Sequence, residues 1–98
     1  MDLELFRASV DSDSEPPSGL NDELKALWHE AKGDWERAHE LCQAASSSEG
    51  DWVHAYLHRV EGDLPNASYW YRRSGQPIYK GSLESEWAMI AEELLSRV

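Results

Sequence analysis

Apolar residues recur every three or four positions along five segments of the chain, which is the spacing of an amphipathic α-helix. The pattern predicts helices over residues 21–32, 35–46, 51–61, 64–73 and 83–97. A shorter helix is expected over residues 1–10, with Leu3, Phe6 and Val10 on one side. No segment shows the alternation typical of a β-strand, so we expect an all-α fold.

Two stretches of the chain resemble each other at a constant offset of 29 residues. Residues 26–38 read ALWHEAKGDWERA, and residues 55–67 read AYLHRVEGDLPNA. Each contains a Gly-Asp pair, in which glycine can end one helix and aspartate can cap the next. A repeat of this length indicates one supersecondary unit used twice. We therefore expect two consecutive helical hairpins and a C-terminal capping helix over residues 83–97, about five helices in all.

The second half of each repeat resembles a known helical motif. The runs GDWERAHEL and GDLPNASYWY are similar to the turn and second helix of tetratricopeptide-type hairpins, in which an alanine follows the turn glycine by five positions. The resemblance covers about residues 22–74 and implies a TPR-like stack of helices. The whole chain also resembles a group of short bacterial proteins, through WHEAKGDW, HAYLHR and YWYRRSGQP. That second resemblance implies no particular activity.

Composition divides the chain into an N-terminal segment and one helical domain. Residues 11–19 read DSDSEPPSG, which is acidic, polar and interrupted by two prolines. Such a stretch is typical of an exposed, flexible linker. We therefore assign residues 1–19 to an N-terminal segment with a linker, and residues 20–98 to a single helical domain.

The overall charge argues against several classes of partner. The 98 residues carry a formal net charge of −10, which opposes binding to nucleic acid and to anionic membrane surfaces. No apolar run is long enough to span a bilayer. The first residues lack the pattern of a signal peptide, and the single cysteine cannot form an intrachain disulfide. We expect a cytoplasmic protein.

Positive charge and aromatic residues are concentrated in the second half of the chain. Residues 1–50 have a net charge of −8, whereas residues 52–80 have a net charge of +2 and hold six of the ten aromatic residues. Arginine binds carboxylate and phosphate through its planar fork, and Tyr, Trp and Arg dominate interface hot spots. We predict a ligand-binding patch that includes Arg59, Arg72, Arg73, Tyr69 and Trp70. The alternative is that the aromatic residues form core and the arginines pair with acidic neighbours.

Two histidines on the third predicted helix complete the candidate site. His54 and His58 lie one helical turn apart, and Glu61 follows three residues later. This spacing could hold a divalent metal ion if His29 or His39 supplied a third ligand. The sequence favours a structural role over a metal site, because His29 and His58 occupy equivalent places in the repeat. It predicts no cofactor and no catalytic residue.

Three hypotheses follow. We favour a small cytoplasmic binding or adaptor module that recognises a protein, a peptide or a small anionic ligand through the basic aromatic patch. The alternative is a small enzyme or metal-binding protein that uses His54 and His58, with Arg72 and Arg73 holding an anionic substrate. The third is a homo-oligomeric structural protein, in which an exposed apolar face pairs with a second copy.

Overall fold

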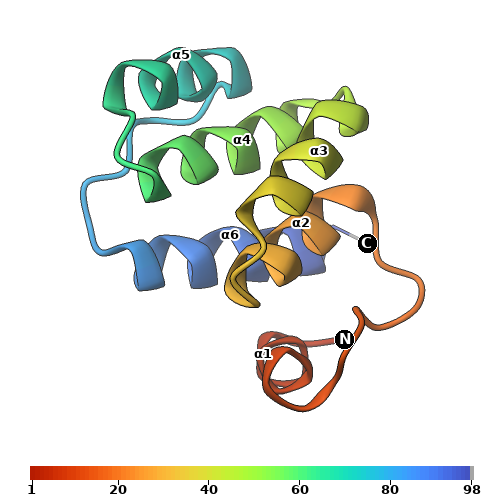
Figure 1. Cartoon of the computed structure of the whole chain (residues 1–98). Helices are drawn as coiled ribbons and strands as arrows, with labels where there is room; N and C mark the ends of the chain where they lie inside the picture. Colours follow the sequence, from red (N-terminus) through yellow and green to blue (C-terminus); the bar gives the residue numbers. More distant parts are fainter. Residues whose placement is uncertain (98) are drawn as a thin grey trace.

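The computed structural model describes residues 1–97 and contains six α-helices and no strand in that range (Figure 1). The helices are α1 (Leu3–Ser12), α2 (Asp22–Ala31), α3 (Trp35–Ala45), α4 (Ser48–Val60), α5 (Leu64–Ser74) and α6 (Leu83–Ser96). The all-α prediction is confirmed, and the expected short helix near the N-terminus brings the number to six. None of these helices is both long and apolar enough to cross a membrane.

The two Gly-Asp pairs form equivalent corners between antiparallel helices. Gly33 and Gly62 both have left-handed backbone conformations, with φ of 93° and 83°. Asp34 caps α3 and Asp63 caps α5, each by accepting a hydrogen bond from the backbone N–H three residues later. The helices on either side of each corner pack together, α2 on α3 and α4 on α5. Both predicted hairpins are therefore present.

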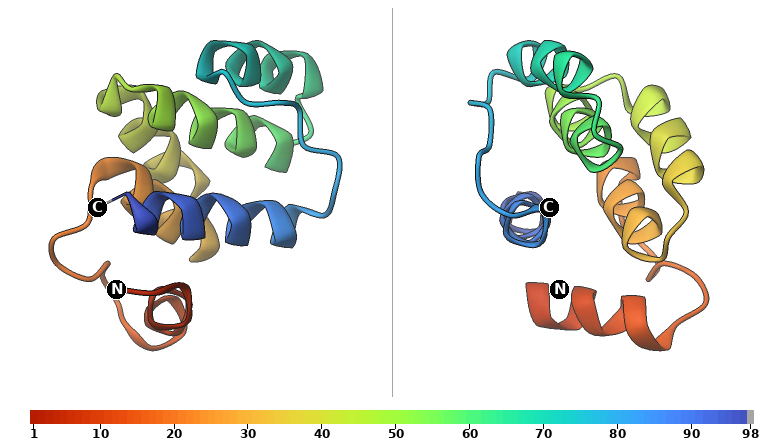
Figure 2. Two further views of the ribbon diagram at one scale, coloured as in Figure 1. Left: turned by 180° about the vertical axis from the view of Figure 1, so that it is seen from behind. Right: turned by 60° about the vertical axis from the view of Figure 1, so that its left-hand side comes forward.

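Helix α4 lies at the centre of the molecule (Figure 2). It contacts α2, α3, α5 and α6, and every residue over 52–58 is buried. A helix buried on most of its circumference must be apolar around most of it, and five of these seven residues are apolar or aromatic. The expected start at residue 51 was three residues late. Ser47 caps the helix by accepting from the N–H of Gly50, so helical structure begins at Ser48.

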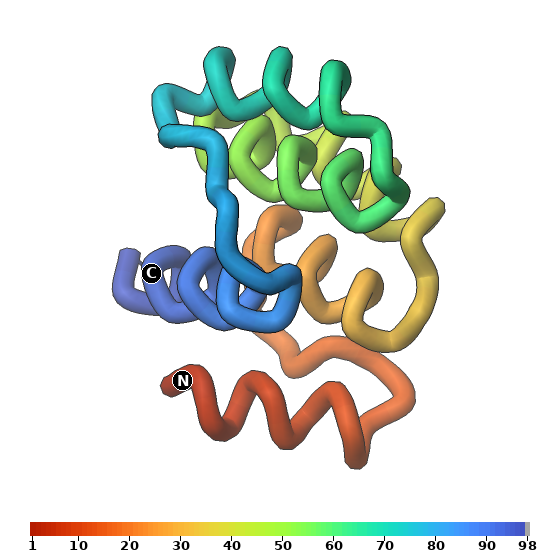
Figure 3. Tube along the Cα trace, turned by 90° about the vertical axis from the view of Figure 1, so that its left-hand side faces the viewer, coloured from red at the N-terminus to blue at the C-terminus, as the bar shows by residue number. Residues whose placement is uncertain are grey.

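The C-terminal helix α6 lies across one face of the hairpins and contacts α2 and α4 (Figure 3). Trp87 anchors it by donating its indole N–H to the carbonyl of Leu27 at 2.9 Å. Glu86, although charged, is fully buried and pairs with Arg59 of α4 at 2.8 Å. Such a pair needs both partners, because a buried charge left alone is costly.

The N-terminal helix α1 packs against α6. Phe6 is fully buried and stacks on Trp87, with ring centroids 5.5 Å apart. Ser9 accepts a hydrogen bond from the indole N–H of Trp28 at 3.0 Å. The residues before the acidic linker thus contribute side chains to the same core as the hairpins.

Candidate functional site

Three histidine side chains meet where α3 packs against α4. His39 comes from α3, and His54 and His58 come from successive turns of α4. The Nε2 atoms of His39 and His54 lie 2.9 Å apart. The rings of His54 and His58 stack with centroids 4.8 Å apart, and His39 lies across both of them. One ring nitrogen from each of the three lies within 4.8 Å of the other two.

Helix geometry explains why these side chains converge. His54 and His58 are four residues apart, so both project from one face of α4. Trp35 and His39 have the same spacing on α3 and share a face of that helix. Trp35 is fixed on α4 because its indole N–H donates to the carbonyl of Leu57 at 2.7 Å. This contact turns the shared face of α3, and with it His39, toward the α4 histidines.

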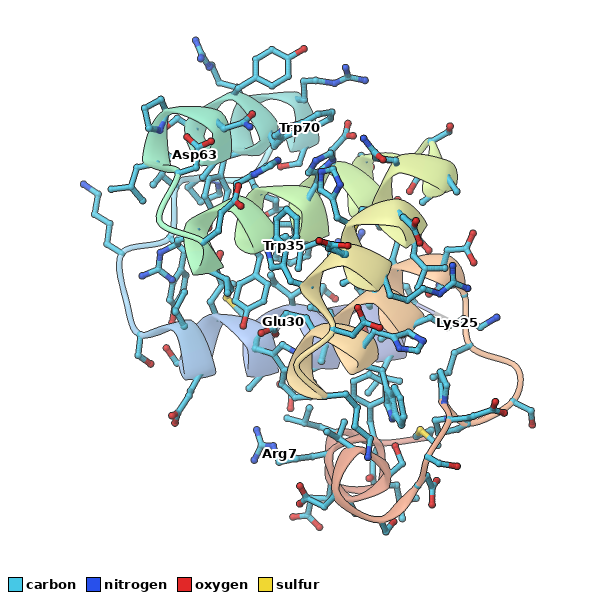
Figure 4. The ribbon with its side chains drawn as sticks, viewed as in Figure 1. Arg7, Lys25, Glu30, Trp35, Asp63 and Trp70 are labelled. Atoms are coloured by element: carbon cyan, nitrogen blue, oxygen red, sulfur yellow. The ribbon has the colours of Figure 1, made fainter. Side chains whose placement is uncertain are left out.

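Two indoles cover the histidine cluster, which we define as His39, His54 and His58. Trp35 stacks on the His39 ring with centroids 4.9 Å apart and an interplanar angle of 11°. Trp70 of α5 stacks on the His54 ring at 3.8 Å and 15°. Figure 4 shows the two tryptophans on separate elements around α4. The indoles restrict how far these imidazole rings can rotate.

A carboxylate orients the third ring. The Nδ1 atom of His58 lies 2.7 Å from Oε1 of Glu61, which follows at the end of α4. A carboxylate accepts hydrogen bonds, so this contact assigns the hydrogen of the neutral ring to Nδ1 and leaves the lone pair on Nε2. Carboxylates commonly orient metal-binding histidines in this way.

Burial keeps His39 and His54 uncharged at neutral pH. His54 and His58 are only 3% and 6% exposed, whereas His39 is half-buried. Desolvation, together with the smaller effects of the neighbouring His39, His58 and Arg73, lowers the pKa of His54 to about 3. Desolvation also lowers the pKa of His39. Neutral imidazoles retain the lone pairs that metal ions require.

Three other predicted site residues lie on α5, two of them beside the cluster. The guanidinium of Arg73 lies over the Trp70 ring, 5.0 Å from its centroid, and pairs with Asp51 of α4 at 3.5 Å. Tyr69 is 47% exposed and meets Trp70 edge to face at 5.2 Å. Arg72 is exposed.

Arg59 faces a different part of the molecule. Its side chain binds Glu86, donates to the carbonyl of Gly81 and lies over the ring of Tyr79, 5.6 Å from the centroid. These contacts are with α6 and the segment that precedes it. The structure therefore does not join Arg59 to the other predicted residues, and the alternative of an arginine paired with an acidic neighbour describes it better.

Sequence reasoning left open which histidine would be the third. The structure brings His39 to the cluster, while His29 packs edge-on against the Trp28 ring at 5.2 Å. Trp35, which was not among the predicted site residues, is partly buried and forms one wall of the site. The four-residue spacing of Trp35 and His39, which puts both side chains on one face of α3, was the sequence feature that could have indicated this contact.

Two surface clefts lie away from the cluster. The larger, of about 750 Å³, lies between α1 and the hairpin helices and is lined in part by Glu30, Tyr56 and Trp87. The smaller, of about 450 Å³, is lined in part by Trp52 and Tyr79. Neither is lined by a histidine of the cluster or by a predicted arginine.

Comparison of the chain with protein-family models, with curated proteins and with solved structures finds no match. The functional interpretation therefore rests on the geometry of the residues themselves.

Proposed function

We propose that this protein binds a divalent transition-metal ion, with Zn²⁺ as the best fit, through His39, His54 and His58. The observation that supports it most strongly is the convergence of three ring nitrogens within 4.8 Å of one another. In a tetrahedral zinc site with Zn–N bonds of about 2.0–2.1 Å, ligand nitrogens are separated by roughly 3.3 Å. The 2.9 Å separation between His39 and His54 is close to that value.

The chemistry of the surroundings supports the same proposal. Imidazole suits zinc, copper and nickel, and His39 and His54 are in the neutral form that a metal ion requires. Glu61 holds His58 in the tautomer whose Nε2 can bind a metal. One of the two Nε2 atoms in the His39–His54 contact carries a hydrogen, and that ring binds a metal through Nε2 once the hydrogen moves to its Nδ1.

The fold supplies the rigidity that a metal site requires. We propose that the two hairpins are tetratricopeptide-like in their corners and act as a scaffold that holds α3 against α4. Arg72, Arg73, Tyr69 and Trp70 stay a predicted anion-binding surface, and Arg73 and Trp70 adjoin the histidine cluster. The proposed function thus follows the alternative hypothesis from the sequence, with His39 added.

Titration of the metal-free protein with Zn²⁺ tests this proposal. We expect one ion per chain, with affinity reduced by about 100-fold or more in His39→Gln and His54→Gln, since each removes one of three ligands. Glu61→Gln should reduce affinity by about 10–100-fold, because it removes only the orienting carboxylate.

His29→Gln is the matched control, because His29 lies outside the cluster. It should bind Zn²⁺ like the unmodified protein. Circular dichroism in the presence of a chelator would establish that each variant is folded. Equal binding by His39→Gln and His29→Gln would contradict the proposal.

A further inference from the structure

Among residues 1–97, the cluster provides three candidate metal ligands and no fourth. Within residues 1–97, no further His, Cys, Asp or Glu atom joins the group formed by His39, His54 and His58. The carboxylate of Glu61 contacts the cluster, but it pairs with Nδ1 of His58, which is on the opposite side of the ring from Nε2. Zinc sites with three protein ligands characteristically complete their coordination with a molecule from solution.

Solvent can reach the cluster from one side. His54 and His58, on α4, are buried, but His39 and the Trp35 ring that covers it are both partly exposed. Trp70, on the other flank, is also partly exposed. An ion held by the three rings would therefore have its vacant position on the solvent side of the cluster, between the partly exposed indoles of Trp35 and Trp70.

The local charge favours an anion at that position. Three neutral imidazole ligands leave the full charge of a divalent ion uncompensated. The carboxylate of Glu61, which contacts His58 and not the ion, offsets part of that charge. Arg73 adds positive charge beside the Trp70 ring that stacks on His54. Arginine binds the oxygens of carboxylates and phosphates in a bidentate manner.

We infer that the metal ion keeps one coordination position open to solvent and that a small oxyanion, a carboxylate or a phosphate, fills it, attracted in part by the charge of Arg73 from beyond the Trp70 ring. This inference rests on the proposed metal binding. It would make the centre a site for ligand binding, in contrast to the closed four-ligand sites that serve only to stabilise a fold.

Co²⁺ provides the test, because its visible absorption bands respond to the number and kind of its ligands. The metal-free full-length protein is loaded with one equivalent of Co²⁺ and titrated separately with acetate and with inorganic phosphate. We expect one or both anions to shift the bands in a saturable way. The relative affinities then distinguish a carboxylate ligand from a phosphate ligand.

Two neighbouring arginines provide matched variants for the role of Arg73. Arg73→Gln should weaken anion binding by about two- to five-fold, the range of an exposed ion pair. Arg72→Gln, an exposed change of the same kind on the same helix, should leave it unchanged. Asp51→Asn should strengthen anion binding, because it releases Arg73 from its pairing at 3.5 Å.

The possible results separate the two proposals. If Co²⁺ binds through the histidines but neither anion at saturation changes the bands, the open position does not exist and this inference is overturned alone. If Co²⁺ does not bind, or binds equally well to His39→Gln, the proposed metal binding fails and this inference fails with it. If Arg73→Gln and Arg72→Gln weaken anion binding equally, Arg73 has no specific role in binding the anion.

Discussion

The imidazole of His54 lies flat against the indole of Trp70, with ring centroids 3.8 Å apart and planes inclined by 15°. His54 is on α4 and Trp70 is on α5, so this contact crosses the second hairpin. It covers the ring from solvent and leaves its outer edge directed at His39. The stacking therefore links the stability of the hairpin to the protonation state of the cluster.

The first prediction concerns acid stability without metal. The unfolded chain takes up a proton at His54 near pH 6.5, whereas the folded chain does so only near pH 3. Between these values the unfolded state binds more protons, so stability falls as the pH is lowered. We expect the free energy of unfolding to decrease by about 2 kcal/mol from pH 7 to pH 5 for this group. Urea denaturation in a chelating buffer measures it.

His54→Gln is the control for that pH dependence. It should have a smaller decrease between pH 7 and pH 5, with the remainder coming from His39 and His29, whose pKa values burial also lowers. If the free energy of unfolding decreases as much in His54→Gln as in the unmodified protein, the pKa of His54 is not lowered in the folded state.

The second prediction concerns the buried ion pair between α4 and α6. Arg59→Met leaves the fully buried carboxylate of Glu86 with only the Tyr71 hydroxyl as a partner. We expect destabilisation by about 3–5 kcal/mol, measured by urea denaturation, because removing one member of a buried pair leaves a desolvated charge. Combining Arg59→Met with Glu86→Leu should recover most of this loss.

The matched control for the ion pair is on the surface. Arg37 and Glu40 pair at 3.6 Å, but their side chains are 52% and 68% exposed. Arg37→Met should change the free energy of unfolding by no more than about 0.5 kcal/mol. A similar effect at Arg37 and Arg59 would mean that the Glu86 pair contributes no more than a surface contact.

The third prediction concerns α1. Phe6→Ala removes a fully buried ring that stacks on Trp87, and we expect it to cost about 3 kcal/mol. Leu5→Ala on the same helix should cost little, because Leu5 is 60% exposed. Hydrogen exchange provides a second readout, since Phe6→Ala should accelerate exchange within α1. If the two variants are equally stable, α1 does not contribute to the core in solution.

The fourth prediction concerns the hairpin corners. Gly62 has a φ of 83°, and a side chain there meets no atom within 4 Å, so only backbone conformation opposes a substitution. Gly62→Ala should lower the free energy of unfolding by about 1–2 kcal/mol. Gly62→Asn should cost less, because asparagine adopts the left-handed conformation more readily. Thermal unfolding of both variants tests this, and an Asn variant less stable than the Ala variant would contradict it.

The sequence by itself determined the local features of this protein. Helix ends at Gly33 and Gly62, and caps at Asp34 and Asp63, depend on hydrogen bonds within a few residues, so the order of residues specifies them. The spacing of His54 and His58 also placed them on one face without further information. The apolar spacing placed the start of α4 three residues too late, because it does not register Ser47 as the cap.

Only the tertiary structure decided which distant residues meet. His29 and His39 were both candidates, and the packing of α3 on α4, fixed by Trp35, selected His39. Arg59 and Arg73 are alike in sequence terms, but α6 presents a buried carboxylate to the first and Trp70 presents a ring face to the second. Helical periodicity specifies the face on which a residue lies. It does not specify which element covers that face, because that depends on contacts across the whole chain.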